Sequence, residues 1–168
     1  HIALSRAGIS KVEFDGYMNF LTEFAYWLFD CNCEIINGKE FEEFFLDYET
    51  KFIPPGSFDT IKNKLLISKI IKEEDGYYCF IYKYLFYFLV AKKIAKMLER
   101  SEGKSIINRL FNNLHEEKNA NILVFITHHT DNLTFIQDSI LSTMIPFEKT
   151  VPITLKKQDD YYKLLEEI

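Results

Sequence analysis

Two short β-prone runs on either side of an acidic turn constrain the fold of this chain more than any other feature. Residues 68–72 (Ser-Lys-Ile-Ile-Lys) and 77–81 (Tyr-Tyr-Cys-Phe-Ile) flank Glu73-Glu74-Asp75-Gly76. An Asp-Gly pair between such runs is a strong local signal for a tight β-hairpin. The pattern therefore predicts one hairpin in the middle of a chain whose other segments have helical periodicity.

Three helices are predicted before the hairpin. Apolar residues recur at three- and four-residue steps over 13–30 and again over 39–52. Pro54-Pro55-Gly56 ends the second pattern, and Ser57 is a suitable N-cap for a third helix that runs to about residue 67. Residues 33–36 form a short strand candidate, closed by the turn pair Asn37-Gly38. Three helices, a short strand and a hairpin are the elements of a winged helix.

A helical bundle is predicted after the hairpin. The periodicity places further helices over five segments: 83–100, 102–116 (with Ser101 as its cap), 119–127, 131–143 (with Asp131 as its cap) and 159–168. We therefore expect a mainly α fold, in which a winged-helix-like module of three helices plus a β-hairpin is followed by a helical bundle. The expected boundaries are 1–82 for the module and 83–168 for the helical segment packed on it.

Composition and charge exclude several classes of protein. The chain has 16 Phe, 10 Tyr and 1 Trp but only 6 Gly and 4 Pro, which favours long elements around an aromatic core. A net charge of −5 gives no general attraction to nucleic acid. The most apolar run, residues 77–91, is too short to cross a bilayer comfortably and contains Lys83. We therefore expect no membrane partner.

The cysteines and the N-terminus indicate where the chain functions. Three cysteines with a single C-x-C pair (Cys31 and Cys33) fit neither a disulfide framework nor a zinc site, so we expect a reducing, cytoplasmic location and inert thiols. The first residues lack the basic region and apolar run of a signal peptide. The chain does not begin with Met, so we expect a fragment of a longer protein.

No motif in the chain predicts catalysis or a metal site. Gly103-Lys104-Ser105 resembles part of a phosphate loop, but Leu98 occupies the position of the required upstream Gly. His128 and His129 are adjacent, so they diverge by about 100° on a helix and do not share one metal ion. We expect them to act as cations near a helix C-terminus. The carboxylate clusters fall on predicted turns and exposed faces, so an enzyme is not expected.

A basic patch lies on the predicted third helix and the first hairpin strand. Its members are Lys51, Lys62, Lys64, Lys69 and Lys72 against Asp59 alone, a local charge of +4. The alternative function is therefore a winged-helix DNA-binding transcriptional regulator with C-terminal dimerisation helices. The acidic hairpin tip and the absence of Arg from the helix oppose contacts to phosphates and guanine. Nucleic acid is thus not the partner that we expect.

The segment 78–91 (YCFIYKYLFYFLVA) resembles a signature of NACHT-type signal-transducing ATPases, the STAND class. In that family a winged-helix domain follows the ATPase core, and its last strand enters a helix with the pattern Phe-x-His-x-x-Phe-x-Glu-Tyr-Phe-x-Ala. The family's apolar positions are kept at Phe80, Leu85, Phe88 and Ala91. Residues 114–116 and 119–129 resemble the helical part that follows in bacterial members, so the resemblance covers about residues 60–168.

Two departures from the signature bear on the role that the resemblance implies. The family's His falls at Tyr82 and its Glu at Tyr87. In better-known members that His reaches the phosphates of ADP and stabilises the resting state. The resemblance makes Tyr82 the candidate nucleotide sensor. Tyr82 can donate one hydrogen bond but has no cationic form, so its interaction with ADP phosphates is expected to be weaker than that of the family's His.

The resemblance implies a regulatory and interaction segment of a bacterial STAND ATPase in antiphage defence, which couples nucleotide state to sensing and oligomerisation. The Walker motifs are absent here and are expected N-terminal to His1. ATP or ADP and Mg²⁺ would therefore bind the intact protein, and no cofactor is expected to bind this chain. The implied partners are the protein's own ATPase core, its C-terminal sensor region and further copies in an active oligomer. Tyr77, Tyr82, Tyr84 and Tyr87 are the aromatic residues expected to supply a docking face.

Overall fold

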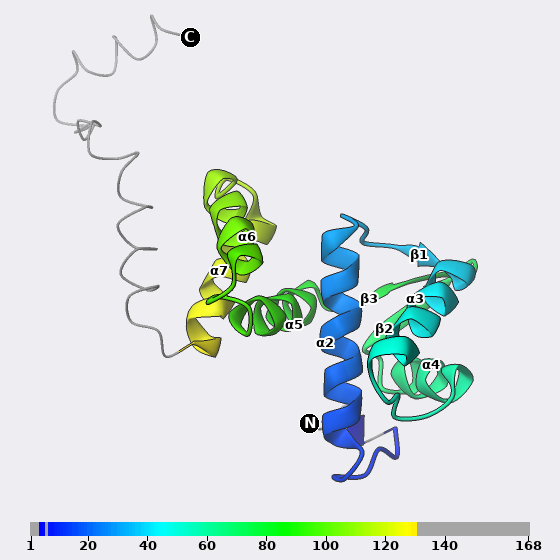
Figure 1. Ribbon diagram of the computed structural model, residues 1–168. Helices are drawn as coiled ribbons and strands as arrows, with labels where there is room; N and C mark the ends of the chain where they lie inside the picture. The colour runs from blue at the N-terminus through cyan, green and yellow to red at the C-terminus, as the bar shows by residue number, and fades with distance from the viewer. Residues whose placement is uncertain (1–3, 6, 131–168) are drawn as a thin grey trace, which may run out of the picture. The chain divides into compact units, whose positions relative to one another are not determined.

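The computed structural model describes residues 4, 5 and 7–130, and the helices predicted beyond Asp131 lie outside these residues. The described part is mainly helical, with a small three-stranded antiparallel sheet. Its elements in chain order are α2 (Phe14–Asp30), β1 (Ile36–Asn37), α3 (Gly38–Lys51), α4 (Phe58–Ile67), β2 (Ile71–Glu74), β3 (Tyr77–Phe80), α5 (Lys83–Ala95), α6 (Ser101–Asn112) and α7 (Glu117–His129). The long helix α2 has the sheet, α3 and α4 on one side and α5 to α7 on the other (Figure 1).

The predicted hairpin is confirmed. β2 pairs with β3 in a register that runs from Ile71 opposite Phe80 to Glu74 opposite Tyr77. Asp75 and Gly76 both have positive φ angles, 53° and 81°, as a two-residue type I′ turn requires. β1 pairs with the other edge of β3, so the sheet order is β1-β3-β2.

The predicted turn at Asn37-Gly38 is wrong, because Asn37 begins α3 instead. The Asn37 side chain accepts a hydrogen bond from the Glu40 amide at 3.0 Å, and the Glu40 carboxylate accepts one from the Asn37 amide at 2.8 Å. This capping box satisfies two amides at the start of the helix. Of the strand candidate at 33–36, only Ile36 is in a strand, because β1 covers Ile36–Asn37. Ser57 caps α4 as predicted.

The helix predicted at 83–100 ends earlier than expected. α5 ends at Ala95, residues 96–99 form turns, and α6 begins at Ser101, so Ser101 lies inside the helix that it was predicted to cap. Apolar spacing continues through Met97 and Leu98, both buried, and no Gly or Pro marks the break. The sequence pattern therefore predicted two helices here but could not locate the end of the first.

The core is an aromatic cluster between α2 and α3. The Phe24 and Phe41 ring centroids are 4.7 Å apart, and those of Phe20 and Tyr48 are 5.0 Å apart. The apolar positions of α3 at Phe41, Phe44, Phe45 and Tyr48 are all buried. This cluster uses the high aromatic content in edge-to-face and stacked pairs, which add to the hydrophobic gain.

An ion pair joins α2 to α5 beside this core. The Lys93 ammonium lies 2.6 and 2.7 Å from the two carboxylate oxygens of Glu23, and both side chains are largely shielded from solvent. Partial burial strengthens such a pair, and it makes the loss of either partner costly. None of the described helices is long and apolar enough to span a membrane.

Candidate functional site

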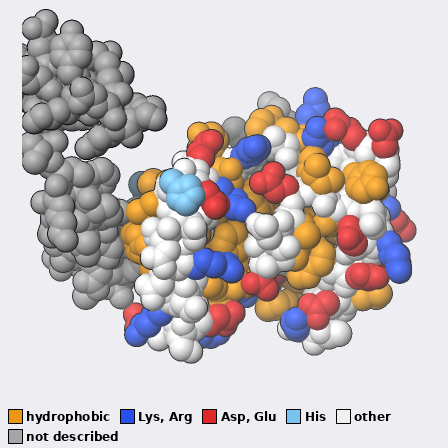
Figure 2. Space-filling view, turned by 90° about the horizontal axis from the view of Figure 1, so that it is seen from above, with side chains coloured by type: hydrophobic (Ala, Val, Ile, Leu, Met, Phe, Trp, Pro, Cys, Tyr) orange, Lys and Arg blue, Asp and Glu red, His pale blue; other side chains and the backbone are white. Residues whose placement is uncertain are grey.

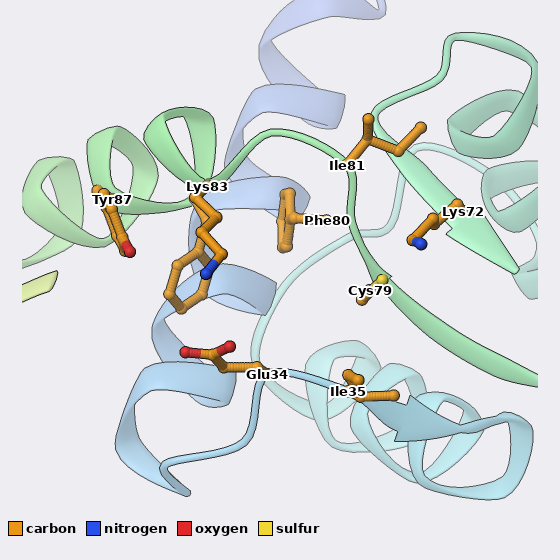
Figure 3. Close-up of a pocket in the computed structure, with 9 residues that line it drawn as sticks. Glu34, Ile35, Lys72, Cys79, Phe80, Ile81, Lys83 and Tyr87 are labelled. Carbon is orange, nitrogen blue, oxygen red and sulfur yellow. The ribbon is translucent and has the colours of Figure 1, made fainter. Parts of the chain in front are cut away.

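A pocket of about 300 Å³ lies where the open face of the sheet meets the start of α5. Figure 3 shows the side chains around it, which come from the segment before β1, from β2 and β3, and from α5. The apolar lining comprises Ile35, Cys79, Phe80, Ile81 and Phe86. The polar lining comprises Glu34, Lys72, Lys83 and Tyr87.

Strand alternation explains how Lys72 and Cys79 come to line the pocket, on the face of the sheet opposite to its buried face. Ile71 and Tyr78 point to the buried face of the sheet, so their neighbours Lys72 and Cys79 point to the open face. Ile35 extends this open face and is 60% exposed. The open face therefore combines apolar side chains with a few charged groups.

Two opposite charges and the hydroxyl of the largely buried Tyr87 lie around the pocket. The Lys83 side chain extends from the start of α5 toward the side of the pocket where Glu34 lies (Figure 3). Neither residue takes part in a salt bridge within the described part of the chain. Burial raises the pKa of Tyr87, with smaller contributions from the carboxylates of Glu117 and Glu34, so its hydroxyl stays protonated. The pocket can hold an apolar group that carries a polar end.

Tyr82 lies beside this pocket but does not line it. Its carbonyl oxygen accepts the first hydrogen bonds of α5, from the amides of Leu85 at 3.1 Å and Phe86 at 3.2 Å. Its side chain is 60% exposed and caps no amide. Tyr77 and Tyr84 are also exposed, whereas Tyr87, the fourth tyrosine of the predicted docking face, is buried. Three of the four tyrosines are therefore exposed: Tyr77 beside the hairpin turn, and Tyr82 and Tyr84 at the start of α5.

The structure gives most lysines of the basic patch a carboxylate partner. Salt bridges join Lys62 to Asp59 at 3.0 Å, Lys64 to Glu13 at 3.3 Å, Lys72 to Glu74 at 2.8 Å, and Lys51 to Asp47 at 2.6 Å. Lys69 lies exposed in the turn before β2, with φ of 55°. Figure 2 shows acidic and basic side chains interspersed on the face it presents. The local positive charge is therefore largely compensated.

The other motifs have structural roles. Gly103, Lys104 and Ser105 lie within the first turns of α6. The ring centroids of His129 and Phe88 lie 4.5 Å apart in an edge-to-face contact. Burial lowers the pKa of His129, so the prediction of a cation is wrong for His129. In the described residues, no three His, Cys, Asp or Glu side chains are placed to hold a metal ion.

The thiol of Cys31 is expected to react slowly, in line with the predicted inertness. Its Sγ donates to the Leu28 carbonyl oxygen at 3.4 Å, and although the residue is exposed, partial desolvation of the thiol raises the pKa of Cys31 to about 11. Because the thiolate is the nucleophile, alkylation at pH 7.5 should be at least about tenfold slower than that of an ordinary thiol, and should accelerate up to pH about 11.

The measurement is iodoacetamide labelling of Cys31 at a series of pH values, followed by mass spectrometry. A variant that keeps only this cysteine, with Cys33→Ser and Cys79→Ser, isolates its signal. The same variant unfolded in urea is the control, and its rate should level off near pH 8.5. Equal pH profiles for the folded and the unfolded chain would contradict the raised pKa.

Sequence reasoning did not find the pocket. Glu34 and Lys83 carry no motif, and they are brought together only because β1 pairs with the strand that leads into α5. Comparison with models of known protein families, with curated proteins and with solved structures gave no match.

Proposed function

We propose that this chain is a winged-helix and helical regulatory segment of a bacterial STAND-type ATPase in antiphage defence, which carries no catalysis of its own. The observation that supports it best is the order α2-β1-α3-α4-β2-β3, with β3 central in the sheet. A strand between the first two helices and a hairpin after the third is the arrangement that the resemblance implies. In this proposal the winged helix spans residues 1–82, and the helices after it support the module.

Charge favours a protein partner over DNA for this winged helix. Lys62 and Lys64, on the helix that would enter the major groove, are paired with carboxylates within the chain. The hairpin tip carries Glu73, Glu74 and Asp75, which would oppose phosphates. DNA binding would have to break these pairs, so the transcriptional-regulator alternative has no supporting observation.

The surface that we propose to contact the ATPase core is the one around the start of α5. Tyr82 and Tyr84 are each more than half exposed there, next to the apolar pocket, and Tyr77, also more than half exposed, lies at the turn end of β3. Tyrosine is frequent at protein interfaces because its ring buries apolar area while its hydroxyl keeps a hydrogen bond. A neighbour that rotates away when nucleotide exchanges would expose this surface again.

The decisive test is the coding sequence upstream of His1. The proposal expects a Gly-x-x-x-x-Gly-Lys-Ser/Thr motif there, and a protein that includes it should bind ATP or ADP with Mg²⁺. An upstream region without this motif, or an intact protein that binds neither nucleotide, would end the proposal.

Within that protein, Tyr82→Phe should release bound ADP about two- to tenfold faster, the range that the loss of one hydrogen bond gives. Release is measured by displacement of a fluorescent ADP analogue. Tyr84→Phe is a matched control, since Tyr84 is similarly exposed two positions further along the chain. Identical release from both variants would remove the sensing role of Tyr82 and leave the regulatory proposal to the upstream test.

A further inference from the structure

A second cleft, of about 580 Å³, lies between α2, the end of α3 and the connection from α5 to α6. Aromatic side chains form much of it. Phe44 and Tyr48 are buried at its base, and Trp27 and Phe52 stand beside them with ring centroids 5.5 Å from Phe44 and 5.0 Å from Tyr48, respectively. Trp27 is half-buried and Phe52 is 36% exposed, so both rings leave area free for a ligand.

The charges of the cleft leave a small negative excess. Glu23 with Lys93 and Asp47 with Lys51 are paired within its walls at 2.6 Å. The remaining charged groups are Asp30, Glu102 and Arg100, a net charge of −1. Asp30 and Arg100 take part in no salt bridge within the described residues, whereas Glu102 accepts a hydrogen bond from the Tyr26 hydroxyl at 3.3 Å.

The cleft already places one cation over an aromatic ring. The Lys93 ammonium lies 5.9 Å from the centroid of the Tyr26 ring while it pairs with Glu23. A ring face on one side and a carboxylate on the other is the environment that favours ammonium and guanidinium groups. Trp27, whose indole gives the strongest cation–π attraction, has no cation of the protein over it among the described residues.

We propose that this cleft binds an organic cation, an alkylammonium or guanidinium group on an apolar stem, against the face of the Trp27 ring, with Asp30, three residues further along α2, as the nearby counter-charge. The aromatic walls take the stem and the ring faces attract the charge. An anion would meet Asp30 and Glu102 with only Arg100 in its favour. Two sources share this chemistry, a small quaternary amine and a Lys or Arg side chain of a peptide.

The chain contains a single tryptophan, so Trp27 fluorescence reports on this cleft directly. Titration with tetramethylammonium chloride should give a saturable change, whereas sodium chloride and the neutral analogue tert-butanol should not. A Gly-Ser hexapeptide with one Arg, compared with the same peptide carrying Gln, tests the second source. Tighter binding of either cation identifies the source, and equal responses to charged and neutral probes would overturn the proposal.

Variants of opposite charge give the sign of the interaction. Asp30→Asn should weaken binding of the cation about two- to fivefold, and Arg100→Gln should tighten it by a similar factor, because partly exposed charge pairs contribute in this range. Glu42→Gln is the matched control, since it removes the same charge from an exposed position of α3 that does not line the cleft. The reverse order of affinities for the cation, or no difference from the control, would overturn the proposal.

Discussion

Replacing Phe24 by alanine is expected to lower the free energy of unfolding by about 3–5 kcal/mol. Phe24 is 1% exposed, and its ring centroid lies 4.7 Å from that of Phe41, 5.0 Å from Phe44 and 5.7 Å from Phe80. The substitution therefore removes contacts from α2 to both α3 and β3 and leaves a cavity. Such a loss is a large share of the stability of an ordinary domain, about 5–15 kcal/mol.

Urea denaturation followed by the fluorescence of Trp27 measures the effect of Phe24→Ala. Leu46→Ala is the control, because Leu46 is on α3 but 55% exposed, and its loss should change the free energy of unfolding by less than about 0.5 kcal/mol. If the two variants have similar midpoints, the aromatic cluster is not the centre of the core.

Gly103→Ala is expected to destabilise the chain by about 2–3 kcal/mol, even though alanine favours helices. A Cβ at this position would overlap the carbonyl oxygen of Met97, a backbone atom that cannot turn aside as a side chain can. The turn that ends α5 therefore packs against α6 at a point where only a hydrogen fits. Relief of the overlap would need α6 to shift away from the end of α5.

Gly56→Ala gives the comparison for Gly103→Ala. At Gly56 a Cβ would meet the Thr60 Cγ2 atom at 3.4 Å, an ordinary contact, so the change in free energy of unfolding should stay within about 1 kcal/mol. Thermal unfolding by circular dichroism distinguishes the two variants. A Gly103→Ala chain as stable as Gly56→Ala would show that the α5–α6 connection tolerates a side chain.

The local elements were predictable because their signals lie within a few residues. Asp75-Gly76 determined the hairpin turn, Ser57 the start of α4, and the apolar periodicity the extent of α2. The end of α5 was not predictable, since it depends on the approach of Gly103 to a segment six residues earlier. The capping role of Asn37 was missed because Asn-Gly is equally typical of a turn.

The two candidate sites were beyond sequence reasoning for a different reason. Trp27 and Phe52 are 25 positions apart and face one cleft only because α3 returns along α2. The sequence did identify the exposed tyrosines of the hairpin and α5. Tyr87 was also predicted to lie on that face, and this was wrong because Tyr87 is buried. Charge counts likewise missed the salt bridges that compensate the lysine patch, since Glu13 reaches Lys64 from a distant segment.

Only Ile81 and Tyr82 separate the end of β3 from the start of α5. The Ile81 amide is hydrogen-bonded to the Ile70 carbonyl oxygen at 3.0 Å, which ties this short connection to the residue before β2. Because the connection is short and hydrogen-bonded, we expect the hairpin and α5 to change position together and not independently of each other.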